Sequence, residues 1–260
     1  ANPNLGVSVS EDYLITEAKR ASELPSYENT FKRLHLNIWT STITKWISDS
    51  VWMENYEEID LESLKGQRCW GGLDLASTMD LSSLVLYFPM EEQKDVVLVW
   101  FWCPEDSAEL RGRKYKLPYD EWIVDGYIKA TEGDVQDYEY IRQDINNIVN
   151  EYDLQSIAFD RWNSSQLIIQ LSQQDGIPMS QFGQGYRSMS APTKELEKLV
   201  LKKEINHLNN PVLRWQCENV SLQTDPAGNI KINKQRSSEK VDGMVALVMA
   251  LGEMMTDETD

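Results

Sequence analysis

Three runs of β-branched and aromatic residues follow one another between residues 69 and 103. The runs cover 69–76, 82–89 and 95–103, and short polar segments separate them. The second separator, 90–95, reads Met-Glu-Glu-Gln-Lys-Asp. Apolar runs of this length joined by short turns are typical of neighbouring antiparallel strands. The pattern therefore predicts a three-stranded antiparallel meander.

After residue 103 the hydrophobic period alternates between that of a helix and that of a strand. We expect helices over 119–129, 138–151, 164–174, 191–205 and 239–255, strands over 155–160 and 178–183, and a hairpin over 219–233 that turns at Asp225. Ser238 is the expected N-cap of the last helix, and Glu239 is expected in its first turn. A meander followed by alternating helices and strands is typical of an α/β fold with a mixed central sheet flanked by helices.

The first 65 residues differ in their hydrophobic pattern from the rest of the chain. Ser8-Val-Ser-Glu11 fits a capping box that opens a helix ending near Leu24, and the segment has no strand pattern. We therefore predict two parts. Residues 1–65 form a helical arm, or the linker from a preceding domain, and residues 66–260 form one α/β domain.

Three aspartates, far apart in the chain, each lie at the edge of an apolar run. Asp74 follows Trp-Gly-Gly-Leu, Asp160 follows Ile-Ala-Phe, and Asp242 precedes Gly-Met-Val-Ala-Leu. Carboxylates beside an apolar core are costly unless they have a partner or bind a metal. Each also has an ordinary alternative. Asp74 would end a strand, Asp160 would cap a helix or pair with Arg161, and Asp242 would interact with the dipole of its helix.

A metal site in these segments would consist of oxygen ligands, because the chain has only two histidines. Oxygen ligands favour Mg²⁺ or Mn²⁺. In chain order the acids fall on the first strand of the meander, at the end of a later parallel strand and at the start of the final helix. This is the ribonuclease-H-like layout, in which carboxylates hold two metal ions for phosphodiester hydrolysis. Asp80, in the connection after the first strand, is either a turn former or a fourth ligand.

The charge balance limits which partners the chain can bind by electrostatics alone. Its 260 residues carry 42 acidic and 25 basic side chains, a formal net charge of −17. This charge argues against coating of nucleic acid or membranes, and no apolar run approaches the length of a membrane span. It does not exclude a nuclease, whose metal ions supply positive charge locally. The three cysteines are odd in number and widely spaced, which is typical of reduced thiols in a cytosolic protein.

Four short segments surround the candidate acids or lie between them. They are Trp-Gly-Gly-Leu-Asp74-Leu-Ala-Ser-Thr-Met-Asp80-Leu, Ala-Phe-Asp160-Arg-Trp-Asn, Gln-Gly-Tyr186-Arg-Ser-Met-Ser-Ala-Pro-Thr-Lys-Glu-Leu and Lys-Val-Asp242-Gly-Met-Val-Ala-Leu. Together they resemble the C-terminal nuclease domain of tailed-phage terminase large subunits. The stretches before residue 40 look like the linker that follows the packaging ATPase in those proteins. The resemblance thus covers essentially the whole chain.

The resemblance implies metal-dependent cleavage of double-stranded viral DNA during genome packaging. Asp74, Asp160 and Asp242 match the metal-binding acids of the family, with Asp80 as a possible fourth, and two Mg²⁺ or Mn²⁺ ions are expected. The implied partners are double-stranded DNA, the portal protein, the terminase small subunit and the ATPase domain, in the host cytoplasm and without a membrane. No Gly-x-x-x-x-Gly-Lys-Ser/Thr loop occurs in these residues, so we expect this chain to cut DNA without translocating it.

Four basic residues in or near the predicted helix 191–205 are candidates for contact with DNA: Arg187, Lys194, Lys198 and Lys202. The lysines recur every four residues and so form a stripe on one face of a helix. Glutamates are interleaved with them, so a solvated helix face without DNA is the alternative.

Two other functions stay open at this stage. Actin-like phosphotransferases share the ancestral fold, but Ala76 stands where their phosphate-binding turn has a glycine. A non-catalytic module that docks on the packaging motor would need the acids only for structure. If the chain is a nuclease, replacing Asp74 or Asp242 with alanine should abolish manganese-supported plasmid cleavage.

Overall fold

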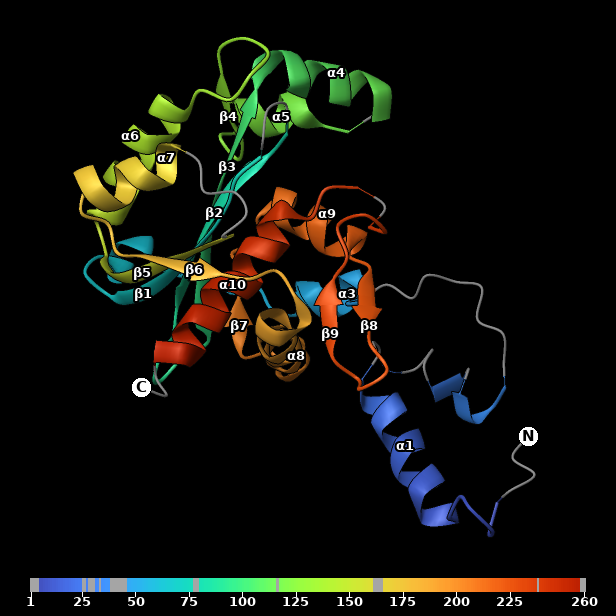
Figure 1. Ribbon diagram of the computed structural model, residues 1–260. Coiled ribbons are helices and arrows are strands. Elements are labelled where there is room, and N and C mark those ends of the chain that lie inside the picture. The colour runs from blue at the N-terminus through green and yellow to red at the C-terminus, as the bar shows by residue number, and fades with distance from the viewer. Residues whose placement is uncertain are drawn as a thin grey trace.

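A mixed β-sheet forms the centre of the computed structural model (Figure 1). The structure describes residues 5–24, 27, 31–32, 34–37, 46–76, 80–115, 117–160, 166–237 and 239–257. The seven strands of the sheet are β1 (Arg68–Asp74), β2 (Ser82–Phe88), β3 (Asp95–Pro104), β4 (Lys129–Thr131), β5 (Asp153–Asp160), β6 (Met179–Phe182) and β7 (Ile205–Asn206). Their order is β4-β3-β2-β1-β5-β6, and β7 pairs with β3 outside this path.

The strand pairing confirms the predicted meander. Strands β1, β2 and β3 pair antiparallel, while β5 joins β1 in parallel and β6 joins β5 in parallel. A separate hairpin, β8 (Leu222–Thr224) and β9 (Ile230–Ile232), turns at Asp225 as expected. The Asp225 carboxylate accepts the backbone N–H groups of Ala227 and Asn229, which closes this turn.

Helices cover both faces of the sheet, as the sequence predicted. They are α4 (Glu105–Tyr115), α5 (Tyr119–Val124), α6 (Tyr138–Val149), α7 (Gln166–Ile169) with the π-helical turn η3 (Gln170–Gln174), α8 (Tyr186–Lys202), α9 (Pro211–Asn219) and α10 (Asp242–Asp257). Helices α8, α9 and α10 pack in one hydrophobic cluster, and α6 and α7 pack in a second cluster on the other face. Within the described residues no helix combines the length and the apolar character needed to cross a membrane.

Helix α10 lies at the centre of the larger cluster and is buried on nearly all sides. Its approach to the sheet depends on Gly72 of β1. A Cβ atom added at Gly72 would lie 1.9 Å from the carbonyl oxygen of Ala246 in α10. The absence of a side chain therefore allows the helix backbone to lie directly against the strand.

Two predicted helices differ from the structure by five residues at one end. The helix expected over 119–129 ends at Val124, because Gly126 takes a left-handed φ of 80°, and strand β4 follows. The helix expected over 191–205 begins earlier, at Tyr186, with a proline inside it, and it ends at Lys202. Strands β4 and β7 were not predicted, because they are too short to show a hydrophobic period. Helices α4 and α9 were also not predicted, and the sequence of α4 is almost entirely polar.

Two helices start later than the sequence predicted. Ser10, not Ser8, caps α1 (Glu11–Glu23), and its side chain accepts the N–H of Tyr13 at 3.2 Å. The last helix begins at Asp242, so Glu239 does not lie in its first turn. The expected N-cap, Ser238, lies outside the described residues.

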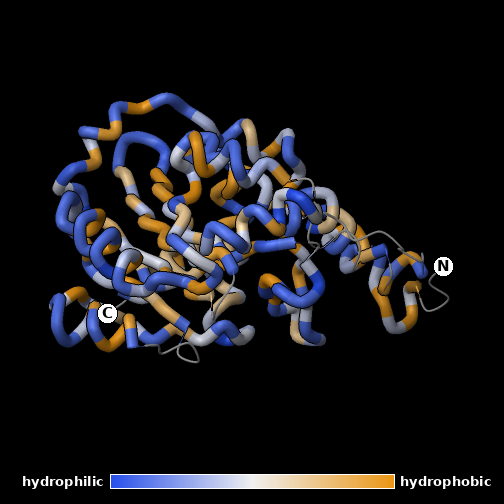
Figure 2. Tube along the Cα trace, turned by 90° about the horizontal axis from the view of Figure 1, so that it is seen from above, coloured by the Kyte–Doolittle hydropathy of each residue, from blue (hydrophilic) through white to orange (hydrophobic). Residues whose placement is uncertain are grey.

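The N-terminal arm has two parts. Helix α1 stands away from the sheet in Figure 1, and the view from above shows the N-terminal end of the chain at one side of the molecule (Figure 2). In contrast, α3 (Asp49–Met53) packs on the α/β domain, followed by the single turn η1 (Leu61–Leu64). Trp46, Ile47 and Trp52 belong to the same hydrophobic cluster as α10. The boundary at residue 65 stays a prediction, but the end of the arm shares the core of the domain.

A buried histidine ties α3 to the domain. The His207 ring stacks on Trp52 at 4.3 Å and donates from Nε2 to the Trp52 carbonyl oxygen at 2.8 Å. Its Nδ1 accepts the N–H of Asn209 at 3.1 Å, so these contacts fit the neutral ring. Burial lowers the pKa of His207 from 6.5 to about 4, and the positive charges of Arg214 and Lys94 add to this effect.

We expect acid to destabilise the fold through His207. Because its pKa is lower in the folded state, the unfolded chain takes up the proton first, so stability is complete above pH 6.5 and falls as the pH drops towards 4. Between pH 7.5 and pH 5 the loss is about 2 kcal/mol. Urea unfolding of wild type and His207→Gln at both pH values measures it. An equal pH dependence in the two proteins would contradict this assignment.

Candidate active site

Two of the predicted acids end neighbouring parallel strands. Leu73 of β1 is in register with Phe159 of β5, so Asp74 and Asp160 follow side by side at the carboxyl ends of these strands. Alternate residues of a strand share a face. Asp74 therefore lies on the same face as Gly72, which is the face that α10 covers.

The third acid reaches the same place from the helix. Asp242 is the first residue of α10, whose N-terminal end lies over the carboxyl ends of β1 and β5. The amino group of Lys234 lies 2.5 Å from Oδ2 of Asp74 and 3.7 Å from Oδ1 of Asp242. Lys234 also interacts electrostatically with Asp160. The structure thus places Asp74 and Asp242 at one lysine, with Asp160 close enough to interact with its charge.

Burial and mutual repulsion mark the acids as an energetically costly group. Only 2% of the Asp74 side chain and 16% of the Asp242 side chain are exposed. Burial, and then the negative charge of Asp74, raise the pKa of Asp242 to about 6, against the pull of Lys234 and Lys240. Burial lowers the pKa of Lys234, but Asp74 and Asp242 outweigh it and the net pKa is raised.

One carboxylate oxygen of the site has no hydrogen-bond partner among the described residues. Oδ2 of Asp242 is buried and accepts no hydrogen bond from the part of the chain that the structure describes. Orphaned buried oxygens are rare and call for an ion, a water molecule or a functional role. A cation beside the carboxylates would satisfy this oxygen and offset the repulsion, so the residues fit a metal that prefers oxygen ligands.

The site is not spaced for a metal as it stands. Among the described residues no three His, Cys, Asp or Glu side chains are grouped closely enough to hold an ion. The ammonium group of Lys234 provides a reason, because it lies between Asp74 and Asp242 and supplies the positive charge there. Lys234 would have to move for an ion to contact both carboxylates.

Sequence reasoning missed two residues that contact Asp74. They are Lys234, which follows strand β9, and Gln184, whose Nε2 lies 3.5 Å from Oδ1 of Asp74. Neither belongs to a motif with its own signal, since a lone lysine or glutamine after a strand is common. Lys231 donates to the carbonyl oxygen of Gln184 at 3.3 Å and so links β9 to the segment that carries Gln184.

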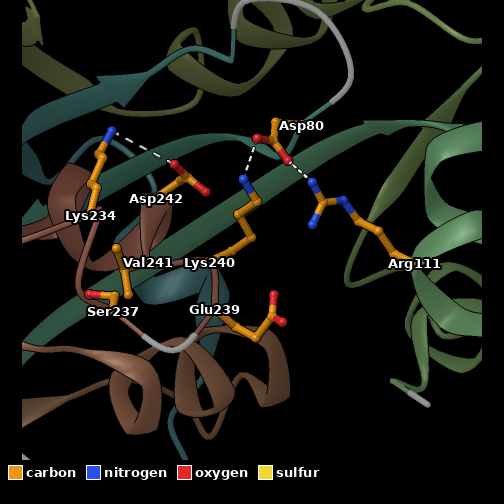
Figure 3. A pocket seen from close by; sticks show the side chains of 8 residues that line it. All are labelled: Asp80, Arg111, Lys234, Ser237, Glu239, Lys240, Val241 and Asp242. Atoms are coloured by element: carbon orange, nitrogen blue, oxygen red, sulfur yellow. Dashed lines mark hydrogen bonds and ion pairs between the residues drawn. The ribbon is translucent and has the colours of Figure 1, made fainter. Parts of the chain in front are cut away.

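Asp80 lines the same pocket as Asp242 but has cationic partners of its own. Its carboxylate pairs with Arg111 of α4 on one oxygen and with Lys240 on the other (Figure 3). These three side chains, with Lys234 and Asp242, line a pocket of about 450 Å³. The suggested role of Asp80 as a fourth metal ligand stays a prediction, but the structure gives its carboxylate two cationic partners.

The predicted DNA contacts lie along α8 at different distances from the acids. Arg187 is in the first turn, beside Gln184, and lines a pocket of about 430 Å³ with Gly183, Gly185 and Ser188. At 1.5 Å per residue, Lys202 is about 22 Å further along the helix. Lys198 and Lys202 also pair with nearby glutamates. Arg187 is therefore the best placed of the four predicted residues, and Lys194 lies between.

The fold and the converging carboxylates define a ribonuclease-H-like protein with an acidic site at the carboxyl ends of its central strands. A model of the family described as terminase large subunit, endonuclease domain, matches residues 1–258. The chain belongs to this family of phage DNA-packaging proteins.

Similar proteins agree with this membership. The terminase large subunit of Enterobacteria phage HK97 is 36% identical over 257 residues, which is 97% of this chain and 50% of that protein. Protein YmfN of Escherichia coli (strain K12) is 30% identical over 271 residues, which is 100% of this chain and 59% of that protein. The crystal structure of the HK97 large terminase superposes with a TM-score of 0.75 at 35% identity, covering 97% of this chain and 52% of that one. This chain spans between 50% and 59% of the length of these relatives.

Proposed function

We propose that the chain is a divalent-metal-dependent endonuclease that cleaves double-stranded viral DNA by phosphodiester hydrolysis during genome packaging. The observation that carries the proposal is the convergence of Asp74, Asp160 and Asp242 around Lys234, with an orphaned oxygen on Asp242. Membership in the terminase nuclease family supports the same reaction.

The three aspartates would hold Mg²⁺ or Mn²⁺, with two ions as the expected number. When bound, the ions would activate a water molecule and stabilise the charge that develops on the phosphate. Asp74 and Asp160 are fixed by adjacent strands, and Asp242 is fixed by the first turn of a buried helix. Rigid elements of this kind hold carboxylates in place better than loops do. Lys234 would balance their charge when no ion is present.

The partners follow from the role of terminases in packaging. Double-stranded DNA is the proposed substrate, and the portal protein, the terminase small subunit and an ATPase domain are the proposed protein partners, in the host cytoplasm. The net charge of −17 opposes DNA binding away from the site. The chain alone would therefore bind DNA weakly, and these partners would have to deliver the DNA to it.

Metal binding provides a direct test. We expect MnCl₂ to raise the melting temperature of the chain relative to EDTA, because an ion that binds only the folded state stabilises it. At a free concentration 100 times the dissociation constant, the gain is about 2.7 kcal/mol. The same samples should cleave supercoiled plasmid in Mn²⁺ and leave it intact in EDTA. Asp242→Asn is the matched variant, which should lose most of the thermal shift. Undiminished cleavage in EDTA would exclude a metal-dependent mechanism.

A further inference from the structure

One carboxylate in the pocket beside the acids is held in the way that proteins hold a phosphate. Arg111 and Lys240 approach the two oxygens of Asp80 from opposite sides, as Figure 3 shows. An arginine together with a lysine around an oxyanion is also the usual recognition of a phosphate group. Arg111 and Lys240 thus form an anion site that already contains an anion of the protein itself, in a pocket that Glu239 and Asp242 also line.

The cations of this pocket come from two separate elements next to the catalytic acids. Arg111 lies on α4, and Lys240 lies two residues before Asp242. Lys240 also belongs to the segment after β9 that carries Lys234. The turn at 233–237 is rigid, because the Asn233 side chain accepts two backbone N–H groups and its carbonyl accepts the hydroxyl of Ser237. A phosphate bound by Arg111 and Lys240 would lie close to Asp242, because Lys240 precedes Asp242 by two residues.

The backbone of Asp80 does not depend on its carboxylate. The Gln136 side chain donates to the Asp80 carbonyl oxygen, and the Tyr138 hydroxyl donates to the Ala76 carbonyl oxygen at 2.7 Å. The carboxylate itself is partly open to solvent, with 36% of the side chain exposed. Its ion pairs can therefore open while these two backbone contacts, at Ala76 and Asp80, are kept.

We propose that Arg111 and Lys240 form a binding site for a backbone phosphate of DNA, and that Asp80 occupies this site until DNA displaces it. The proposal rests on the proposed function, since it places the phosphate next to the scissile region of a nuclease substrate. Asp80 is then a competitor for the DNA phosphate and not a metal ligand. DNA must displace Asp80 and so break its two ion pairs. This cost lowers the affinity of the chain for DNA.

The test is DNA binding by Asp80→Asn in EDTA, where no cleavage occurs. The amide keeps the shape of Asp80 but releases Arg111 and Lys240, so the affinity of the 260-residue chain for a 20-base-pair duplex should rise about fivefold at low salt. Adding Lys240→Gln to this variant should reverse the gain. The slope of log affinity against log salt concentration should also become shallower by about one in the double variant, because one phosphate contact is lost.

A matched control separates this effect from a simple change in charge. Asp175→Asn makes the same change of charge and releases Arg142, which Asp175 binds through both oxygens. Asp175 precedes β6 and so lies towards the amino ends of the parallel strands β5 and β6, whereas the acids lie at the carboxyl ends. Its variant should change DNA affinity less than twofold.

Three results would overturn the proposal. The first is an equal affinity of the Asp80→Asn and Asp175→Asn variants for DNA. The second is a loss of the manganese-induced thermal shift in Asp80→Asn, which would make Asp80 a metal ligand. The third is thermal stabilisation by inorganic phosphate at matched ionic strength that Asp80→Asn strengthens, which would assign the pocket to free phosphate. If wild type still cleaves plasmid, each of these results contradicts only this proposal and not the proposed nuclease function.

Discussion

Replacing Asp74 with asparagine is expected to reduce manganese-supported plasmid cleavage by roughly 1,000-fold or more, which corresponds to about 4 kcal/mol of lost transition-state stabilisation. Asparagine keeps the shape of the side chain but removes the negative charge that the ions and Lys234 would share. The folded state should persist, because the change also removes the repulsion between residue 74 and Asp242. Cleavage rates and a melting curve for the same preparation measure both effects.

Asp144 offers a matched control for this substitution. Its carboxylate accepts Lys129 at 2.7 Å and Trp102 Nε1 at 2.8 Å, so it is also a lysine-paired aspartate with little exposure. It lies on α6, on the face of the sheet opposite α10. Asp144→Asn should lower stability and keep cleavage near the wild-type rate. If Asp74→Asn cleaves as well as Asp144→Asn, Asp74 has no part in the reaction.

Gly72→Ala should prevent stable folding. The added methyl group would lie 1.9 Å from the carbonyl oxygen of Ala246 and 2.8 Å from the backbone nitrogen of Ala250. Both atoms are backbone, so no rotamer change can relieve the overlap, and α10 would have to move away from β1. Overpacking of this severity costs at least about 3 kcal/mol, a large part of the stability of a typical domain. Urea unfolding, or the soluble fraction if unfolding cannot be followed, measures the loss.

Gly112→Ala is the control for this effect. Gly112 lies within α4, and a Cβ there would meet its nearest neighbour at 3.4 Å, an ordinary contact. Alanine is the better helix former by about 1 kcal/mol, so this variant should be as stable as wild type or slightly more stable. Equal stability of Gly72→Ala and wild type would show that α10 does not lie as close to β1 as the structure has it.

The effect of Gly72 extends to the site. Asp242 reaches Asp74 only because the helix that begins at Asp242 lies directly on the strand that ends at Asp74. A small displacement of α10 would separate the two carboxylates that Lys234 now bridges. Variants that tolerate a larger residue at 72 should therefore lose cleavage as well as stability.

The strongest sequence signals were those that depend on local pattern. The meander, the parallel strand 155–160 and the apolar final helix were each predicted because one face or all faces of the element are buried. The acids Asp74, Asp160 and Asp242 could be selected because a carboxylate beside such runs is costly. Their order along the chain then indicated a ribonuclease-H-like site, the segments around them indicated the terminase nuclease family, and the family is confirmed.

Local pattern failed where a loop or a short element decides the geometry. Helix α9 and strand β7 are too short for a hydrophobic period, and the start of α10 at Asp242 depends on the segment that carries Lys234 and Lys240. The lysine stripe on α8 has the right spacing, yet Lys198 and Lys202 are paired and lie far from the acids. The spacing of residues shows which of them share a face of a helix, but it does not show what that face contacts.

The sequence by itself determined the α/β class, the strands that carry the acids and the family to which the chain belongs, because these follow from burial patterns and local motifs. Only the tertiary structure decided which side chains the acids contact. It placed Lys234 between Asp74 and Asp242, and it gave Asp80 to Arg111 and Lys240. Charges act through space and not along the chain, so the partner of a carboxylate can be known only when segments up to 160 residues apart have been brought together.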